Sequence, residues 1–457
     1  MNPQRNVPAV PPNMPSPLAR LWRDEPARGE FPVTIETTTP ILGGAPVTRQ
    51  IDKVDVIRVP TIRGHLRFWW RALYGKAFAT PEKLFEAEAR LWGKAADAHG
   101  GRSQVEISIE MQRSGQLDPD PAETSPAHLY ALWPYRAPAD GTAAPGRRAG
   151  VQFRLKVNAP VAEIDVVKNV VRAWILFGGY GGRTRRGVGS LTVSGDAAAR
   201  RAWLPSADDD EGWDQEPQGF LGNLFHPNPF APSPGSSSFP VLSGTTLLLG
   251  PHYPANRAQD AWAKALAWLR DFRQGVGVAR DPGHGRPGLS RWPEADKLRH
   301  LTGRYGHSAR YTDKTPAWPR AEFGLPIVGQ FKDQGEPPDF QLTWQIGNDD
   351  FQDRMASPVI VKALPTLQGF RPCVLWLARA NPPGRVVAVQ TKPSPKAVIH
   401  GSTAPFGYLG SSTSPAGTAP DQSVSMRLKA PPARKASLQH AFIDWVKAQG
   451  GVVQVAP

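Results

Sequence analysis

The sequence AEIDVVKNVVRAWILFGGYGGRTRRGVGSLTVS, residues 162–194, leads from a helical pattern through a loop of glycines and arginines to an apolar strand pattern. It predicts a helix over Ala162 to Phe177 and a short strand in GVGSLTVS. Between Leu176 and Leu191 it holds six glycines, three arginines and no acidic residue. Two alternatives follow for this loop: it grips a ligand, or it is an irregular end to a helix.

The segments before this stretch supply the rest of one domain. Strands are predicted where β-branched or alternating residues occur, and helices where apolar residues recur at helical spacing. The predicted elements are a strand at Phe31–Leu42, a helix after Thr61, a helix at Pro81–Trp92, strands at Gln104–Gln112 and Val151–Ala159, and an extra strand in HLYALWPY, residues 128–135. Leaving out the additions, strand, helix, strand, strand, helix, strand is the order of a ferredoxin-like fold, which RNA-recognition sheets share.

The length of 457 residues exceeds what one hydrophobic core usually supports, so two domains are expected. The predicted divisions are a proline-rich tail at 1–29, a ferredoxin-like domain at 30–200, an acidic and Pro/Ser-rich linker or exposed insertion at 201–243, and a second domain at 244–457 with a mobile loop at 401–435. The second domain contains a predicted helix at Arg257–Gln274, four apolar strand patterns and a closing helix in SLQHAFIDWVKAQG, but the order of its strands cannot be read from the sequence.

The charge balance favours a polyanionic partner. There are 54 Lys and Arg against 40 Asp and Glu, a formal net charge of +14. Nucleic acid is the leading class of partner and a membrane surface the weaker one. The sequence has no apolar run of about 18 residues and no signal-peptide core at its start, which predicts a cytoplasmic protein. The single cysteine, Cys373, excludes internal disulfides and a Cys-rich zinc site.

The helix after Thr61 has a basic and aromatic strip beside its apolar face. At 100° per residue, Arg63, Arg67, Trp70 and Tyr74 fall within roughly a quarter-turn of one another. Guanidinium groups pair with phosphates and aromatic rings stack on unpaired bases, so the strip suits single-stranded RNA. The alternative is a solvated basic face whose Trp70 packs against a neighbouring element. The sequence favours neither the RNA-binding interpretation nor this alternative.

An ordinary helix end explains Gly178 and Gly179 but none of the other residues of the loop. These are the glycines Gly181, Gly182, Gly187 and Gly189 and the arginines Arg183, Arg185 and Arg186. Successive glycine amides can form an anion-binding concavity that nearby arginines make more positive. The loop matches neither GxxxxGK[ST] nor GxGxxG, so an RNA backbone is a better anion for it than a nucleotide cofactor.

The pairing of TIRGHLRFWWRALYG (61–75) with LFGGYGGRTRRGVGSL (176–191) resembles the RAMP superfamily of CRISPR proteins. Four later segments resemble those of the first RAMP subunit of the type III-B effector, the Cmr complex: FRQGVGVARDPG (272–283), GLSRWPEADKLR (288–299), FGLPIVGQFKD (323–333) and RMASPVIVKAL (354–364). This resemblance implies an α+β protein with two ferredoxin-like (RRM-like) RAMP domains and long insertions.

The resemblance further implies a non-catalytic RNA-binding subunit in antiviral interference. Its partners would be the 3′ part of the guide RNA, the target RNA and other Cmr subunits, with no membrane, metal or small-molecule cofactor. Carried over to this chain, the RNA contacts would be Arg63, Arg67 and Arg71 on the basic helix together with the loop Gly178–Gly189. Arg291, beside Trp292, is either a second contact or part of a structured turn.

The main alternative is a metal-independent RAMP endoribonuclease acting on CRISPR RNA. Such cleavage needs a general base near the 2′-hydroxyl, most often a histidine. His65 is the candidate within the basic helix, yet it has no partner at a recognisable catalytic spacing, which favours a packed or hydrogen-bonded side chain. A third alternative is a structural subunit whose positive charge meets acidic partner proteins.

Overall fold

The structure is a computed structural model. It describes residues 27–456, apart from residues 48, 53, 95–100, 139–140, 207–220, 222–223, 234–236, 275–291, 310–313, 348–349, 353, 392–396 and 408–437. Arg291, the acidic run at 208–211, most of the predicted tail and most of the predicted mobile loop lie outside the described residues. Within those residues, no helix combines the length and hydropathy that crossing a bilayer requires.

The first sheet is antiparallel and has the strand order β3-β6-β1-β7. Its strands are β1 (Arg28–Thr37), β3 (Glu106–Arg113), β6 (Gln152–Pro160) and β7 (Leu191–Val193), and its two helices are α2 (Val59–Tyr74) and α5 (Ile164–Phe177). Helix α2 follows the first strand and α5 follows the third, which is the predicted ferredoxin-like arrangement. In β6, Phe153, Leu155 and Val157 alternate with more exposed residues and are fully buried, so one face of the sheet is apolar.

The second sheet repeats this arrangement. Its four main strands are β8 (Val241–Leu249), β13 (Val359–Pro365), β14 (Gly369–Ala378) and β18 (Val453–Ala456), in the order β13-β14-β8-β18, with helices α8 (Ala258–Gln274) and α11 (Leu438–Lys447). A short fifth strand, β9 (Tyr253–Pro254), pairs with β14 outside this order. Numbered along the chain, both sheets have the order 2-3-1-4. The prediction of an α+β protein with two ferredoxin-like domains is therefore confirmed.

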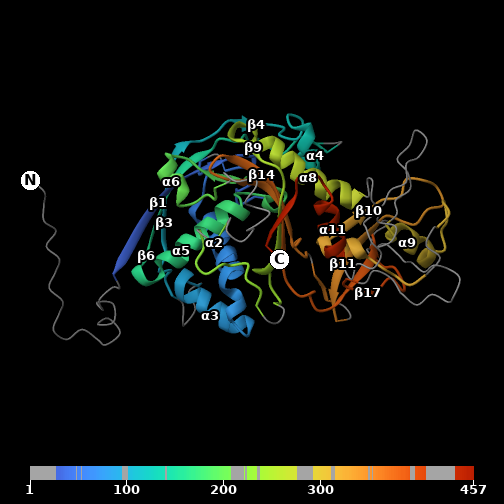
Figure 1. The fold of residues 1–457 in the computed structure, drawn as a ribbon. Helices are drawn as coiled ribbons and strands as arrows, with labels where there is room; N and C mark the ends of the chain where they lie inside the picture. Colours follow the sequence, from blue (N-terminus) through green and yellow to red (C-terminus); the bar gives the residue numbers. More distant parts are fainter. Residues whose placement is uncertain are drawn as a thin grey trace, which may run out of the picture.

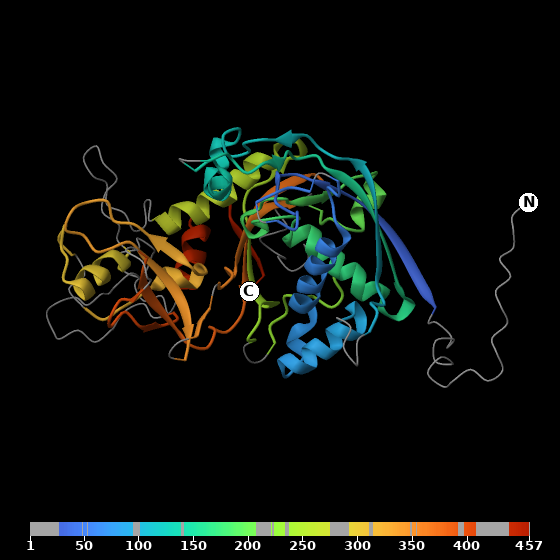
Figure 2. The same ribbon diagram turned by 180° about the vertical axis from the view of Figure 1, so that it is seen from behind.

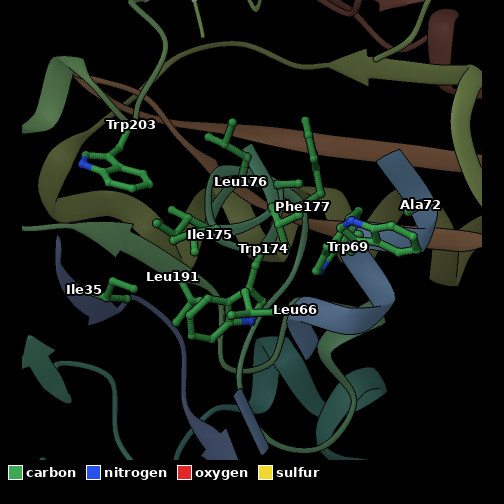
Figure 3. Packing of buried hydrophobic residues seen from close by; sticks show 14 of the residues in the cluster. Ile35, Leu66, Trp69, Ala72, Trp174, Ile175, Leu176, Phe177, Leu191 and Trp203 are labelled. Atoms are coloured by element: carbon green, nitrogen blue, oxygen red, sulfur yellow. The ribbon is translucent and has the colours of Figure 1, made fainter. Parts of the chain in front are cut away.

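The two domains share one hydrophobic core, which puts α2 and α5 between the two sheets. Leu247 and Leu249 of β8 and Ile360 and Leu364 of β13 belong to the same buried cluster as the α2 and α5 side chains. Figure 3 shows part of this cluster, with Trp69 of α2 beside the apolar end of α5. The alternate residues of β13 pack instead with α8 and α11. Because both faces of β13 are covered, its sequence is continuously apolar apart from one lysine.

The insertions form smaller units. A third sheet lies at the end of the molecule away from β1 (Figures 1 and 2). It contains β10 (Ile327–Gly329), β11 (Phe340–Ile346) and β12 (Asp350–Gln352) from the segment between α8 and β13, and β15 (Arg385–Gln390), β16 (Ala397–Val398) and β17 (Ala404–Pro405) from the segment between β14 and α11. Helix α9 (Glu294–Thr302) belongs to the first of these two segments. The first domain carries α3 (Pro81–Trp92), α4 (Leu129–Leu132), α6 (Ala197–Arg201) and a small sheet of β2 (Ile41–Leu42), β4 (Leu117–Asp118) and β5 (Gly146–Arg147). Long insertions were predicted, and they are present.

Two local predictions are wrong. HLYALWPY forms α4 followed by a 3-10 turn, η4 (Trp133–Tyr135), rather than a strand. Its buried residues recur at helical spacing instead of alternating: His128, Ala131, Leu132 and Tyr135. The segment 201–243 is not a fully exposed linker, since Leu204, Phe225 and Phe230 are buried in the shared core. Its acidic and proline-rich composition obscured these apolar anchors.

Candidate nucleic-acid interface

The basic face of α2 points toward α3. The Arg67 Nε lies 2.5 Å from Glu88 Oε1, and the Arg71 Nη1 lies 2.6 Å from the same oxygen. The Glu88 side chain is only 3% exposed, and its one buried carboxylate is shared by the two arginines. Arg63 donates to Ser103 Oγ at 2.6 Å. These guanidinium groups attach α3 and the following loop to α2, and this packing role accounts for their positions without RNA.

The aromatic residues of the same strip also have partners within the protein. Trp70 is 6% exposed and packs against the rings of Tyr74 and Phe78, with ring centroids 6.2 and 6.0 Å apart. The hydroxyl of Tyr74 accepts a hydrogen bond from Asn169 Nδ2 at 3.4 Å, and burial raises the pKa of this phenol. The Trp70 ring therefore has almost no surface left for a stacked base, as in the packing alternative.

The glycine-rich loop, residues 178–189, passes between the two domains. Gly187 has a φ of +75°, and a side-chain carbon there would overlap the indole of Trp262 in α8. Gly189 has a φ of +65°, and a side-chain carbon there would overlap the carbonyl of Tyr180. Only glycine fits positions that combine a left-handed backbone with such close approach. At these two positions the glycines serve contacts within the protein.

The loop's amides are largely engaged within the chain as well. Six of them donate to backbone carbonyls: Gly178 to Trp174 at 2.9 Å, Tyr180 to Gly189 at 2.9 Å, Gly182 to Leu42 at 2.6 Å, Arg186 to Arg183 at 2.8 Å, Gly187 to Thr184 at 3.0 Å and Gly189 to Pro40 at 2.8 Å. Gly179 is buried, its carbonyl accepts a hydrogen bond from the Trp174 indole at 2.9 Å, and Gly181 is half-buried with a φ of +88°. Amides that already have acceptors cannot also cradle a phosphate, so this structure argues against the predicted anion-binding concavity.

Two arginines of the loop bind the backbone of the second domain. Arg186 is buried, and its Nη1 donates to the carbonyl of Val359 at 3.0 Å, while its own carbonyl accepts from Trp262 Nε1 at 2.6 Å. The Arg185 Nη1 donates to the carbonyl of Ser357. Burial lowers the pKa of Arg185 to about 10 and that of Arg186 to about 9. Both side chains join the loop to the second domain by hydrogen bonds, and Arg186 is inaccessible to RNA in this conformation.

A buried lysine completes this junction, and sequence reasoning missed it. Lys362 of β13 is fully buried and donates to the carbonyls of Ile175 and Gly178, at 3.0 and 2.8 Å, at the C-terminal end of α5. A cation is favourable there because the last carbonyls of a helix lack partners and carry its negative dipole end. Burial nevertheless lowers the pKa of Lys362 to about 7. A lysine inside the apolar run PVIVKALP was the available signal.

Arg183 is the loop arginine that remains exposed. It adopts a φ of +58°, a left-handed conformation that is costly for a residue with a side chain. Partial burial of its guanidinium lowers the pKa of Arg183, and the ionisable side chains that act on this group are Tyr130, Tyr135 and Arg273, none of which is a carboxylate. Of the predicted RNA-binding residues that the structure describes, Arg183 is therefore the one whose charge is best placed to meet an external anion.

His65 occupies a packed position on α2. Its ring stacks on Trp174 with centroids 6.2 Å apart and meets Tyr180 edge-on at 6.1 Å. Burial lowers the pKa of His65 to about 4, so the imidazole is neutral at pH 7 and a weak base. This environment matches the expectation of a packed histidine.

Comparison with known proteins supports the predicted similarity of the first domain to the RAMP superfamily. The RAMP superfamily model matches residues 34–192, which hold α2, α5 and the glycine-rich loop. This part of the chain is therefore similar to RAMP domains, in agreement with the resemblance. No curated protein matches the chain significantly.

Among solved structures, the chain is similar to the crystal structure of apo Cmr1 from Pyrococcus furiosus, with 14% identity and a TM-score of 0.49, over 93% of this chain and 98% of that one. It is also similar to a chain in the type III-B Cmr-beta complex bound to cognate target RNA, with 10% identity and a TM-score of 0.42, over 76% of this chain and 94% of that one. A second structure of that complex, with AMPPnP and ssDNA, gives a TM-score of 0.39 at 10% identity and the same coverage.

Proposed function

We propose that the chain is a non-catalytic RNA-binding subunit of a type III-B CRISPR effector, the Cmr complex. In this role it binds the 3′ part of the guide RNA, the target RNA or both, and it contacts other Cmr subunits during antiviral interference. The observation that carries the proposal is the match of the RAMP model to the domain that holds the glycine-rich loop. The formal net charge of +14 supports a polyanionic partner.

The placement of the arginines narrows where RNA would bind. Arg67, Arg71 and Arg186 are bound to the protein itself, whereas Arg183 stands exposed at the edge of the loop. A guanidinium at such an edge pairs with phosphate oxygens, which fixes the path of a strand without reading its sequence. We therefore assign the backbone contact to the rim of the loop around Arg183 rather than to its interior.

The absence of catalysis is part of the proposal. A metal-independent nuclease needs a base that accepts a proton near neutral pH. The depressed pKa and stacked ring of His65 make it unsuited to that task, which supports the binding role over the nuclease alternative. Incubation of the purified chain with labelled guide and target RNA should leave both intact. Cleavage that is lost in His65→Ala would establish the nuclease instead.

The salt dependence of RNA affinity tests the binding role directly. For single-stranded RNA, the log-log slope of affinity against salt should be about −0.7 per neutralised phosphate. Removing the exposed charge in Arg183→Ala should make the slope shallower by roughly 0.7 and weaken binding at every sequence tested. Fluorescence anisotropy over a range of salt concentrations provides the measurement.

Arg67→Ala is the matched control, because it also removes one arginine but from the pair with Glu88. We expect it to lower stability and leave the salt slope unchanged. No detectable binding of guide or target RNA by the wild-type protein, alone or with copurified subunits, would refute the proposed function. Survival of the assembled complex after RNase treatment, with no retained RNA, would favour the purely structural alternative.

A further inference from the structure

A pocket lies beside the exposed arginine of the glycine-rich loop. It has a volume of about 590 Å³, and Tyr130, Trp133, Arg183 and Arg270 are among the residues that line it. Tyr130 and Trp133 come from α4 and η4, Arg183 from the loop and Arg270 from α8, so three separated segments of the chain build it. The volume lies within the range of sites that take small planar molecules.

The aromatic side of the pocket is partly uncovered. Trp133 is 53% exposed, although the Arg136 guanidinium stacks on its ring at 3.1 Å from the centroid. An indole that keeps half of its surface exposed beside a cation can accept a further planar group. The hydroxyl of Tyr130 accepts a hydrogen bond from Arg273 Nη1 at 3.0 Å, which fixes this second ring at the wall.

The charged side of the pocket is positive. Arg270 is paired with Asp271, whose Oδ1 lies 2.7 Å from its Nε, but no carboxylate of the described residues is among the groups that act on Arg183. Arg49 and Arg183 are the described non-glycine residues with positive φ, and the Arg49 guanidinium lies over the ring of Tyr135, 6.0 Å from its centroid. Two arginines are thus held in a costly backbone conformation next to the same turn, η4, and such strain tends to occur at functional positions.

We propose that this pocket holds one unpaired base of a single-stranded RNA, stacked on Trp133, with the adjoining phosphate bound by Arg183. Aromatic rings select for the base, and an unpaired guanidinium beside them selects for the phosphate. An acidic peptide would use the arginines but not the exposed indole. The inference rests on the proposed function and adds a base-stacking site that lies apart from the predicted α2 strip.

The test uses the full-length protein and a fluorescently labelled single-stranded RNA of about ten nucleotides. Trp133→Leu keeps apolar bulk but removes the π-face, and it should weaken binding about 5- to 150-fold, the equivalent of 1–3 kcal/mol for one stacked base. Trp133→Phe retains an aromatic face and should bind within a few-fold of wild type. Phe351→Ala, which removes a 43% exposed ring from β12 in the inserted sheet, is the control and should change nothing.

Two further ligands separate the base from the charge and the strand from a free nucleotide. Inorganic polyphosphate has the charge of RNA without bases, so Trp133→Leu should leave its affinity unchanged while Arg183→Ala reduces it. AMP offers one base and one phosphate without a strand, and it should bind far more weakly than the oligonucleotide because it lacks the neighbouring contacts. Equal affinity for AMP would overturn the assignment to a strand.

The possible failures are distinguishable. If wild type binds RNA and Trp133→Leu binds equally well, the pocket is not a base site while the proposed function stands. If the wild-type protein binds no RNA at all, both the base site and the proposed function are refuted. An equal loss in Trp133→Leu and Trp133→Phe would show that the ring acts through the local fold rather than by stacking, and would also overturn the inference.

Discussion

The residue scale shows how one side-chain type serves opposite purposes in a short loop. Arg185 and Arg186 donate to carbonyls of the second domain, whereas Arg183, two positions earlier, stands exposed. Nothing in the sequence GGRTRRG distinguishes them, because the acceptors of the pinned arginines are contributed by residues more than 170 positions away. The sequence predicts a cluster of charge, but long-range packing decides which charges remain available.

Lys362 provides a pH-dependent prediction at the same scale. Its pKa is lowered from 10.5 to about 7 in the folded protein, so between these values the unfolded chain binds more protons than the folded one. The contribution of this residue to the free energy of unfolding therefore rises with pH, by at most about 1.4 kcal/mol per pH unit. It is smallest at pH 7 and below.

Urea unfolding of wild type and Lys362→Met between pH 7 and 9 measures this effect. The stability difference, wild type minus variant, should increase with pH across that window, because Met carries no proton to gain or lose. Measurements stay below pH 9 since unfolded Cys373, whose pKa is raised from 9.0 to about 12 by burial in the fold, begins to ionise there. A difference that does not change with pH would mean that Lys362 remains charged in the folded protein.

At the element scale, the glycine-rich loop connects the two domains, and its amides bind the protein rather than an anion. Its backbone is fixed by hydrogen bonds to Pro40, to Leu42 of β2 and to α5. Its 3-10 turn, η6 (Thr184–Arg186), packs on β13 and α8. Gly187→Ala would place a side-chain carbon against Trp262 at a φ of +75°. We expect it to destabilise the protein by more than the roughly 1–2 kcal/mol cost of the left-handed conformation alone.

Gly64→Ala is the matched control for that substitution. Gly64 lies in the interior of α2, and a side-chain carbon there has no neighbour within 4 Å. Replacing it with alanine should stabilise the protein by about 0.5–1 kcal/mol, because alanine loses less backbone entropy on folding. Thermal or urea unfolding of both variants compares them. Equal stability of Gly187→Ala and wild type would show that the loop relaxes away from α8.

Elements with a local signal were predictable, and those defined by distant contacts were not. Pro81–Trp92 was predicted with its observed limits, because a proline starts the helix and an apolar face continues it. The order of β8, β13 and β14 in their sheet was not predicted, because strands covered on both faces show no alternation of apolar and polar residues. The basic strip on α2 was recognised, but its role was left open because Glu88 lies 21 residues from Arg67.

At the scale of the whole molecule, the shared core predicts that the two domains unfold together. Leu247 of β8 is fully buried in the cluster that also contains the helices of the first domain. Leu247→Ala should cost about 2–5 kcal/mol, as is usual for a large-to-small change in a core. Hydrogen exchange should then accelerate in β6 of the first sheet as well as in β8. Acceleration confined to the second sheet would show that the domains are energetically separate.

The sandwiched position of α2 and α5 also affects how the chain is made. Each of these helices needs a second sheet to cover it, and the strands that do so, β8 and β13, begin at Val241 and Val359. During synthesis the first half therefore emerges from the ribosome with an apolar surface that stays bare until much of the second half has been translated. A nascent chain of this kind is a natural client for chaperones, and truncation before β13 should yield an aggregating product.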